Sequence, residues 1–162
     1  MAKHRPPKEQ WSDWLGYDQP SGHWGLAVYK YRLVFDGGPV AIPRFLDTDA
    51  DGIWSFGETS AMETRRRRFC KSIRGGYGHP SGKLLALVSE FGLLSKKFPE
   101  CTLQYTFTVA LSKPAAKEKE DELILCYILK YGEPPPANST IPDRWNEYGL
   151  WAKCAALGQK LS

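Results

Sequence analysis

The chain has 162 residues, of which 42% are hydrophobic and 25% are charged, as expected for one globular domain with a buried core. No apolar run is as long as a membrane span, and the polar start MAKHRPPKEQ lacks the pattern of a signal peptide, so we expect a cytoplasmic protein without membrane contact. Four scattered cysteines without a C-x-x-C pair favour reduced, mostly buried thiols over a zinc site or a disulfide framework.

The net charge of +4 is small, but the basic side chains are concentrated. Residues 63–74, ETRRRRFCKSIR, hold six basic side chains against one acidic, and KHRPPK adds a basic arm near the start. Such clustering favours a polyanionic partner, nucleic acid first, and the alternative is a solvated helix face. The candidate nucleic-acid contacts are Arg66, Arg67, Arg68 and Lys71.

The first third of the chain predicts a short helix and two strands. Residues 8–18 place Trp11 and Trp14 at helical spacing, which indicates an amphipathic helix that ends at the glycines and proline that follow. Residues 24–35 and 53–59 are rich in β-branched and aromatic residues and predict two strands. The residues between them form an irregular excursion in which Pro43 argues against a central strand.

A helix is expected from Ala61 to about Arg74, where GGYG ends it. Ser60 and Glu63 have the spacing of a capping box, in which each side chain bonds the other residue's unpaired backbone N–H. Much of the arginine run would lie on the polar face of this helix.

The second half predicts three further helices and one strand. Helical periodicity or composition indicates helices over residues 81–98, 113–131 and 144–158, and alternation indicates a strand over residues 101–111. Gly132 and three prolines end the middle helix. The predicted fold is therefore a single α+β domain over residues 1–162, with a small, largely antiparallel three-stranded sheet flanked by helices.

The segment DTDADGIWSFGETS, residues 47–60, matches two incompatible patterns. The calcium-loop spacing D-x-D-x-D-G-x5-E is met by Asp47, Asp49, Asp51, Gly52 and Glu58. A calcium hand needs a helix on each side, however, and the segment before the loop does not predict one. A hairpin turn at Asp51-Gly52 fits the flanking sequence better, and a calcium-binding interaction protein is the lesser alternative.

Five short motifs, in order, resemble the GIY-YIG nuclease family over roughly residues 24–138. They are A-V-Y at 27–29, S-F-G-E-T-S at 55–60, Arg65 eight residues after Gly57, Y-G-H-P-S-G-K-L-L at 77–85, and E-x-E-L-I-L-C-Y at 120–127 with Asn138 beyond it. The resemblance implies a β-hairpin, an arginine helix, a second helix, a third strand and a glutamate helix as the catalytic core. An N-terminal arm and a C-terminal helix would flank this core.

The resemblance implies an endonuclease that hydrolyses DNA phosphodiester bonds with Mg²⁺ or Mn²⁺. Tyr29 would be the general base or water-orienting group, with its phenol pKa lowered by nearby cations. Arg65 would grip the scissile phosphate and His79 would hydrogen-bond near the attacking or departing oxygen. Such a residue set suits phosphodiester hydrolysis, which needs an activated water and positive charge around the phosphate. Cutting both strands would take a homodimer or two sequential nicks.

One glutamate of the 113–131 helix would hold the metal ion. Glu120 is followed by apolar residues at +3, +4 and +7, as the family pattern requires, and is favoured. Glu122 is the alternate, because its shorter distance to Asn138 fits the family better.

Ser55 stands where the family has its second tyrosine. Either Ser55 acts with a water, or Tyr31 or Tyr77 takes its place, or the enzyme is weakened. The second hypothesis is therefore a catalytically silent nucleic-acid-binding module of the same fold. Gly57 and Asn138 are expected to be structural, with Asn138 tying down the chain after the prolines.

Overall fold

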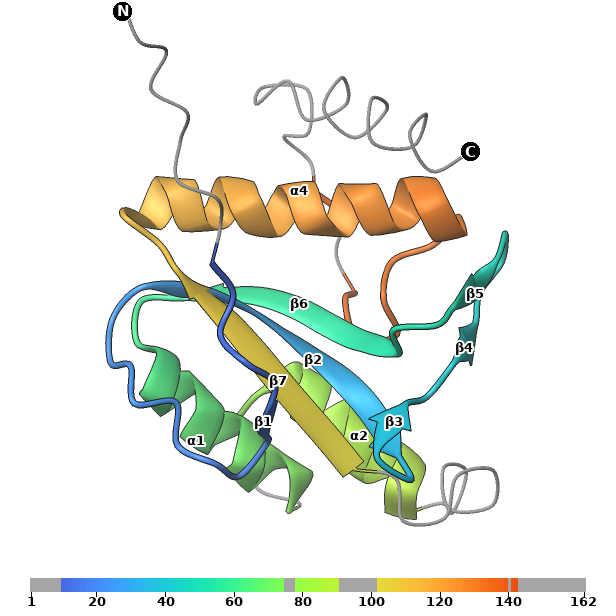
Figure 1. Ribbon diagram of the computed structural model, residues 1–162, viewed down its shortest axis with the longest axis horizontal. Helices are drawn as coiled ribbons and strands as arrows, with labels where there is room; N and C mark the ends of the chain where they lie inside the picture. The colour runs from blue at the N-terminus through green and yellow to red at the C-terminus, as the bar shows by residue number, and fades with distance from the viewer. Residues whose placement is uncertain (1–9, 75–77, 91–101, 140, 143–162) are drawn as a thin grey trace, which may run out of the picture.

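The computed structural model describes residues 10–74, 78–90, 102–139 and 141–142. These residues form an α+β domain in which helices cover both faces of an antiparallel sheet (Figure 1). Helices α1 (Met62–Ile73) and α2 (Pro80–Glu90) lie on one face, and α4 (Lys113–Tyr131) lies on the other. Among the described residues, no helix is both long enough and apolar enough to cross a membrane.

Three long strands make the sheet, with β2 (Ala27–Phe35) in the centre. It pairs antiparallel with β6 (Ile53–Thr59) on one side and with β7 (Thr102–Val109) on the other. Short strands extend this frame: β1 (Leu15–Gly16) beside β7, β3 (Gly38–Pro39) beside β2, and a separate ribbon of β4 (Ile42–Pro43) and β5 (Thr48–Asp49). The three predicted strands are confirmed, and the short strands enlarge the sheet beyond three.

The predicted N-terminal helix is wrong for the described residues from 10 onward. Leu15 and Gly16 form a strand on β7, and residues 10–14 before them have no regular secondary structure. The ammonium of Lys30 lies 4.6 Å from the ring centroid of Trp11 and 5.4 Å from that of Trp14. The two tryptophans therefore share a cationic neighbour on β2, and their spacing mimics a helix face without producing one.

Helix α4 has the predicted bounds, and its ends explain them. Ser112 caps the start by accepting a hydrogen bond from the Ala115 N–H at 3.2 Å, and Pro114 occupies the first turn. Gly132 ends the helix in the left-handed conformation, with φ of 81°. Helix α2 begins one residue before the predicted start, and the predicted residues 91–98 and 144–158 lie outside the described residues.

The predicted capping box at the start of α1 is wrong. Ala61 is the N-cap, and its side chain makes no capping hydrogen bond. The loop before β2 supplies acceptors instead, since Met62 N–H donates to the Gly25 carbonyl and Glu63 N–H donates to the His23 carbonyl. These contacts satisfy backbone N–H groups at the start of α1. The Glu63 carboxylate is therefore not needed as a cap and can form other contacts.

Glu63 is buried and ties α1 to the loop before β2. Its carboxylate lies 2.6 Å from Arg66 Nη2 and accepts hydrogen bonds from the backbone and hydroxyl of Ser21, both at 2.9 Å. Arg66 Nη1 also donates to the Asp18 carbonyl at 3.0 Å. Hydrogen bonding from Arg66 lowers the pKa of Glu63 to about 2.

The acidic segment before β6 forms a turn between strands. Asp49 is buried and accepts hydrogen bonds from the Ile53 N–H and the Tyr127 hydroxyl, both at 2.8 Å. Gly52 has a φ of 66°, and a side chain there would collide with the Val40 carbonyl. The carboxylate of Asp49 thus fastens the turn to α4, and strands rather than helices flank it, against the calcium-hand pattern.

The buried core has one part on each face of the sheet. Tyr31 stacks on Phe69 of α1, with ring centroids 3.8 Å apart, while Phe56 meets Tyr127 of α4 edge-on. A register shift between Tyr31 and Arg32 interrupts the regular pairing of β2 with β6. Cys70 and Cys126, the cysteines among the described residues, carry thiols.

We expect Glu63→Gln to lower the free energy of unfolding at pH 7 by about 2–4 kcal/mol, because Arg66 would be buried without its charged partner. The folded-state pKa lies below the ordinary value of 4.5, so the stabilisation is present above that pH and is lost as the pH falls towards 2. Urea unfolding of both proteins at several pH values checks this. The exposed Asp13→Asn variant is the control, and equal stability of Glu63→Gln and the parent at pH 7 would contradict the prediction.

Candidate functional site

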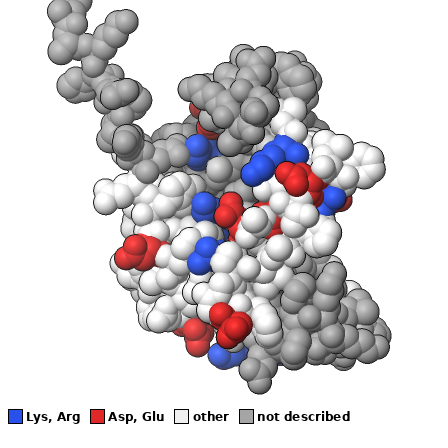
Figure 2. Space-filling view, turned by 45° about the vertical axis from the view of Figure 1, so that its right-hand side comes forward, with Lys and Arg blue, Asp and Glu red and all other residues white. Residues whose placement is uncertain are grey.

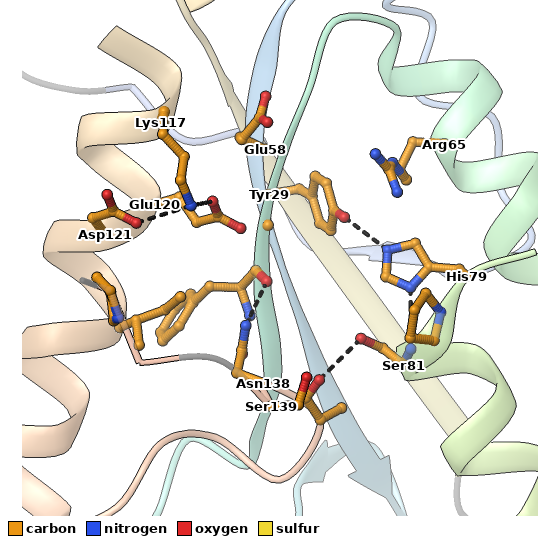
Figure 3. A pocket seen from close by; sticks show the side chains of 16 residues that line it. Tyr29, Glu58, Arg65, His79, Ser81, Lys117, Glu120, Asp121, Asn138 and Ser139 are labelled. Atoms are coloured by element: carbon orange, nitrogen blue, oxygen red, sulfur yellow. Dashed lines mark hydrogen bonds and ion pairs between the residues drawn. The ribbon is translucent and has the colours of Figure 1, made fainter. Parts of the chain in front are cut away.

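A hollow of about 340 Å³ lies between the start of α4 and the facing ends of α1 and α2, beside β6 (Figure 3). It brings together four residues selected from separate sequence motifs: Tyr29, Arg65, His79 and Glu120. The other polar side chains that line it are Glu58, Ser81, Lys117, Asp121, Asn138 and Ser139. Segments distant in sequence therefore meet at one pocket, which we call the site pocket.

The ring of Tyr29 lies across β6 at Gly57. The two residues are direct partners in the β2–β6 ladder. A Cβ atom built on Gly57 would overlap the ring and hydroxyl of Tyr29. Gly57 is thus required to give the Tyr29 hydroxyl its place in the site pocket, a specific reason for its expected structural role.

Tyr29 and His79 form a hydrogen bond of 2.8 Å between the phenol oxygen and Nε2. The Ser81 N–H donates to His79 Nδ1, so the neutral imidazole carries its proton on Nε2 and donates it to Tyr29. Burial, with a smaller contribution from Arg65, lowers the pKa of His79 to about 4. His79 is therefore a neutral hydrogen-bond donor at neutral pH.

The phenol of Tyr29 is almost completely buried. Burial raises its pKa well above the ordinary value, and this outweighs the opposite effect of Arg65. The expected lowering of the Tyr29 pKa by cations is therefore wrong in direction. At neutral pH the phenol keeps its proton, accepts a hydrogen bond from His79 and has its own O–H to donate, which suits orienting a water better than deprotonating one.

Helix α1 positions both Arg65 and His79. The backbone N–H of His79 donates to the Ser72 hydroxyl, which itself donates to the Arg68 carbonyl at 2.9 Å. Phe69 packs edge-on against the imidazole, with ring centroids 5.3 Å apart. One helix thus supplies the arginine of the site pocket and holds the loop that carries the imidazole.

The opposite wall of the site pocket is acidic and belongs mainly to α4. Lys117 Nζ lies 2.7 Å from Glu120 Oε2 and 2.9 Å from Asp121 Oδ1, with Glu58 on the neighbouring strand (Figure 3). Burial raises the pKa of Glu120, and Lys117 opposes this rise. Three carboxylates face one ammonium here, so the wall retains a negative excess that attracts a cation.

The structure brings Glu120, and not Glu122, to the site pocket. Glu122 is absent from the pocket lining and lies 3.3 Å from Lys119 on another side of α4. Within the described ranges, no three His, Cys, Asp or Glu side chains are grouped closely enough to hold a metal ion together. One or two carboxylates beside an open hollow nevertheless fit Mg²⁺, which keeps several waters and takes further ligands from substrate phosphates. The ammonium of Lys117 shows that a positive charge can bind the Glu120 carboxylate.

Asn138 fastens the chain after the prolines to the edge of β6 that faces away from β2. Its side chain accepts from Phe56 N–H at 2.9 Å and donates to the Phe56 carbonyl at 3.1 Å. The side chain thereby replaces a neighbouring strand and closes one end of the site pocket. This geometry matches the tying role expected for Asn138.

Ser55, named as a catalytic candidate, does not line the site pocket. It is fully buried opposite Tyr31 in the ladder, where its hydroxyl has no hydrogen-bond partner. Tyr31 is also buried and is stacked on Phe69, and Tyr77 lies outside the described residues. Among the described residues of the pocket lining, Tyr29 is therefore the only tyrosine.

The arginine run divides between three environments. Arg65 lines the site pocket, Arg66 is buried against Glu63, and Arg67 and Arg68 are exposed. Arg66 is therefore a structural cation rather than the surface contact expected from the sequence. On the face shown in Figure 2, basic and acidic side chains are intermixed without a patch of one sign.

A second hollow, of about 410 Å³, lies on the far flank of α1. Its lining consists of Asp18, Arg66, Arg67, Cys70, Lys71 and Arg74. Arg67 is held over the exposed ring of Trp24, 5.0 Å from its centroid. Arg66 and Arg67 both contact Glu63, so the exposed Lys71 and Arg74 are the main cations with which this hollow, the basic hollow, could take an anionic group.

Lys117, Asp121 and Ser72 are site residues that the sequence motifs do not include. The spacing of Lys117 to Glu120 and Asp121, three and four residues on a helix, was a usable signal for the first two. Ser72 acts through a contact with a distant loop, which no local pattern reveals.

No known protein-family model, curated protein or solved structure matches the chain. The assignment of a function therefore depends on the chemistry of the site pocket and on the motif resemblance.

We expect Gly57→Ala to displace the Tyr29 ring and break its hydrogen bond with His79. Overpacking of this kind costs about 1–3 kcal/mol of unfolding free energy. Urea unfolding measures the destabilisation, and NMR titration of the imidazole should show the pKa of His79 rising from about 4 towards 6.5 as the ring becomes hydrated. Gly38→Ala is the matched control because a Cβ there meets no atom within 4 Å. An unchanged His79 titration in Gly57→Ala would contradict the prediction.

Proposed function

We propose that the protein is a metal-dependent endonuclease of GIY-YIG type that hydrolyses DNA phosphodiester bonds in the site pocket. The observation that carries this proposal is the meeting of Tyr29, Arg65, His79 and Glu120 around one hollow. Each of these residues belongs to a different sequence motif, and the four lie far apart along the chain. Residues unrelated in function would have no reason to meet in one pocket from four separate segments of the chain.

The two opposite walls of the site pocket would have different functions in phosphodiester hydrolysis. Arg65 would grip the phosphate with its planar guanidinium, while Glu120 would hold Mg²⁺ or Mn²⁺ on the opposite wall. The ion, when bound, supplies positive charge at the phosphate and the departing oxygen. Tyr29, fixed by its hydrogen bond with His79, would orient the attacking water between the walls.

A catalytically silent DNA-binding module is the second candidate function. Two observations favour it: Ser55 is buried away from the site pocket, and burial raises the pKa of Tyr29. Both leave the pocket without an evident strong base. Salt-dependent DNA binding without metal-stimulated cleavage would distinguish this candidate from the enzyme.

Plasmid nicking in Mg²⁺ tests the enzymatic proposal. We expect Arg65→Ala and Glu120→Gln each to lower the nicking rate by about 100-fold or more, because each removes charge stabilisation from the reacting phosphate. Glu122→Gln makes the same chemical change two residues along α4, outside the site pocket, and should retain activity. Full activity of Arg65→Ala, or an equal decrease in the two glutamine variants, would contradict the assignment.

The basic hollow would take a backbone phosphate of the same DNA. We expect Lys71→Ala with Arg74→Ala to weaken binding of a DNA duplex, measured without metal, and to reduce the slope of log affinity against log salt. The slope falls by about 0.9 for each DNA phosphate that the variant no longer neutralises. Lys130→Ala removes an exposed charge at the far end of α4 and serves as the control. An unchanged slope in the double variant would remove the basic hollow from the DNA interface.

A further inference from the structure

Lys117 sits between two carboxylates at the first turns of α4. Its ammonium contacts Glu120 and Asp121 at 2.7 and 2.9 Å, as spacings of three and four residues on a helix allow. The Lys117 side chain is 51% exposed, whereas those of Glu120 and Asp121 are 15% and 4% exposed. The cation is therefore half in solvent while both of its partners are largely withdrawn from it.

Lys119 and Glu122 form a second ion pair on the same helix. That pair lies outside the site pocket lining, has an N–O distance of 3.3 Å, and its two side chains are exposed to a similar degree, 19% and 22%. Lys117 instead faces the site pocket, where Glu58 adds a third carboxylate. Withdrawing carboxylates from water without a counter-charge is costly, so the acidic wall needs a cation at all times.

We propose that Lys117 is an exchangeable counter-ion for Glu120, which a divalent cation displaces and which Asp121 then retains. This inference rests on the proposed function of Glu120 as the metal ligand. Lys117 already contacts Oε2 of the carboxylate that would hold the ion, and two cations beside one carboxylate repel each other.

Asp121 has a defined part in the exchange. Its Oδ1 is buried and forms an ion pair with the Lys117 ammonium, and within the part of the chain that the structure describes it has no other hydrogen-bond donor. An ammonium that leaves Glu120 can stay on Asp121 by a small rotation of its flexible stem, so neither charge is left alone. Lys117 thus stabilises the metal-free pocket and lowers its affinity for the ion.

Titration of the protein with Mn²⁺ alone, followed by the EPR signal of free Mn²⁺, tests the exchange without depending on cleavage. We expect Lys117→Met to lower the Kd for Mn²⁺ about fivefold, equivalent to about 1 kcal/mol. The same substitution in a Glu120→Gln background should have no effect, since the shared carboxylate is gone. Lys119→Met removes a neighbouring ammonium outside the site pocket and should leave the Kd unchanged. Urea unfolding of each variant checks that it is folded.

The Mn²⁺ titrations distinguish failure of the exchange from failure of the proposed function. Mn²⁺ binding that requires Glu120 but is unchanged or weakened in Lys117→Met overturns the exchange and leaves the proposed function standing. Tightening of equal size in Lys119→Met, or in the Glu120→Gln background, also overturns it, because the effect would then be general electrostatics. Absence of Glu120-dependent Mn²⁺ binding in every variant overturns both.

Discussion

The close approach of the Tyr29 ring to β6, possible only because Gly57 has no side chain, is the constraint around which the site pocket is arranged. With the ring in this place, its hydroxyl reaches His79, and burial fixes the protonation state of both groups. The imidazole must then be neutral and must carry its proton on Nε2. The strand register thus brings the phenol to His79, and the Ser81 N–H at Nδ1 sets the direction of the hydrogen bond between them.

Helix α1 carries adjacent arginines with different roles, one in the buried structure and one in the site pocket. Arg66 is turned inward and is neutralised by Glu63, which anchors the helix to the loop before β2. Because that anchor fixes the rotation of the helix, Arg65 faces the site pocket and Arg67 faces the basic hollow. The four adjacent arginines therefore lie in three environments, because the Arg66–Glu63 ion pair fixes the orientation of the helix.

Features fixed by neighbouring residues could be predicted from the sequence, and features fixed by distant contacts could not. Helix α4 and strand β6 were predictable because a serine cap, a terminal glycine and β-branched or aromatic runs act within a few residues. The N-terminal helix and the capping box failed because their residues are engaged by distant partners: the tryptophans by β2, and Glu63 by Arg66 and the preceding loop. For the site, the motif resemblance named Tyr29, Arg65, His79 and Ser55 together with a glutamate of α4, and of these Ser55 does not line the pocket. It favoured Glu120 and kept Glu122 as the alternate, and the packing of α4 on the sheet decides that Glu120 faces the pocket.

The charges of the site pocket restrict the ligand that it can take. His79 is neutral and Tyr29 protonated at neutral pH, so the pocket's charge comes from Arg65 on one wall and from three carboxylates with Lys117 on the other. A lone anion would pair with Arg65 but meet repulsion from the acidic wall, and a lone cation would leave Arg65 unused. A phosphodiester accompanied by a divalent cation matches both walls at once. It is this match, more than any single residue, that favours phosphodiester chemistry over the calcium-loop hypothesis, whose Asp49 is already committed to holding a turn.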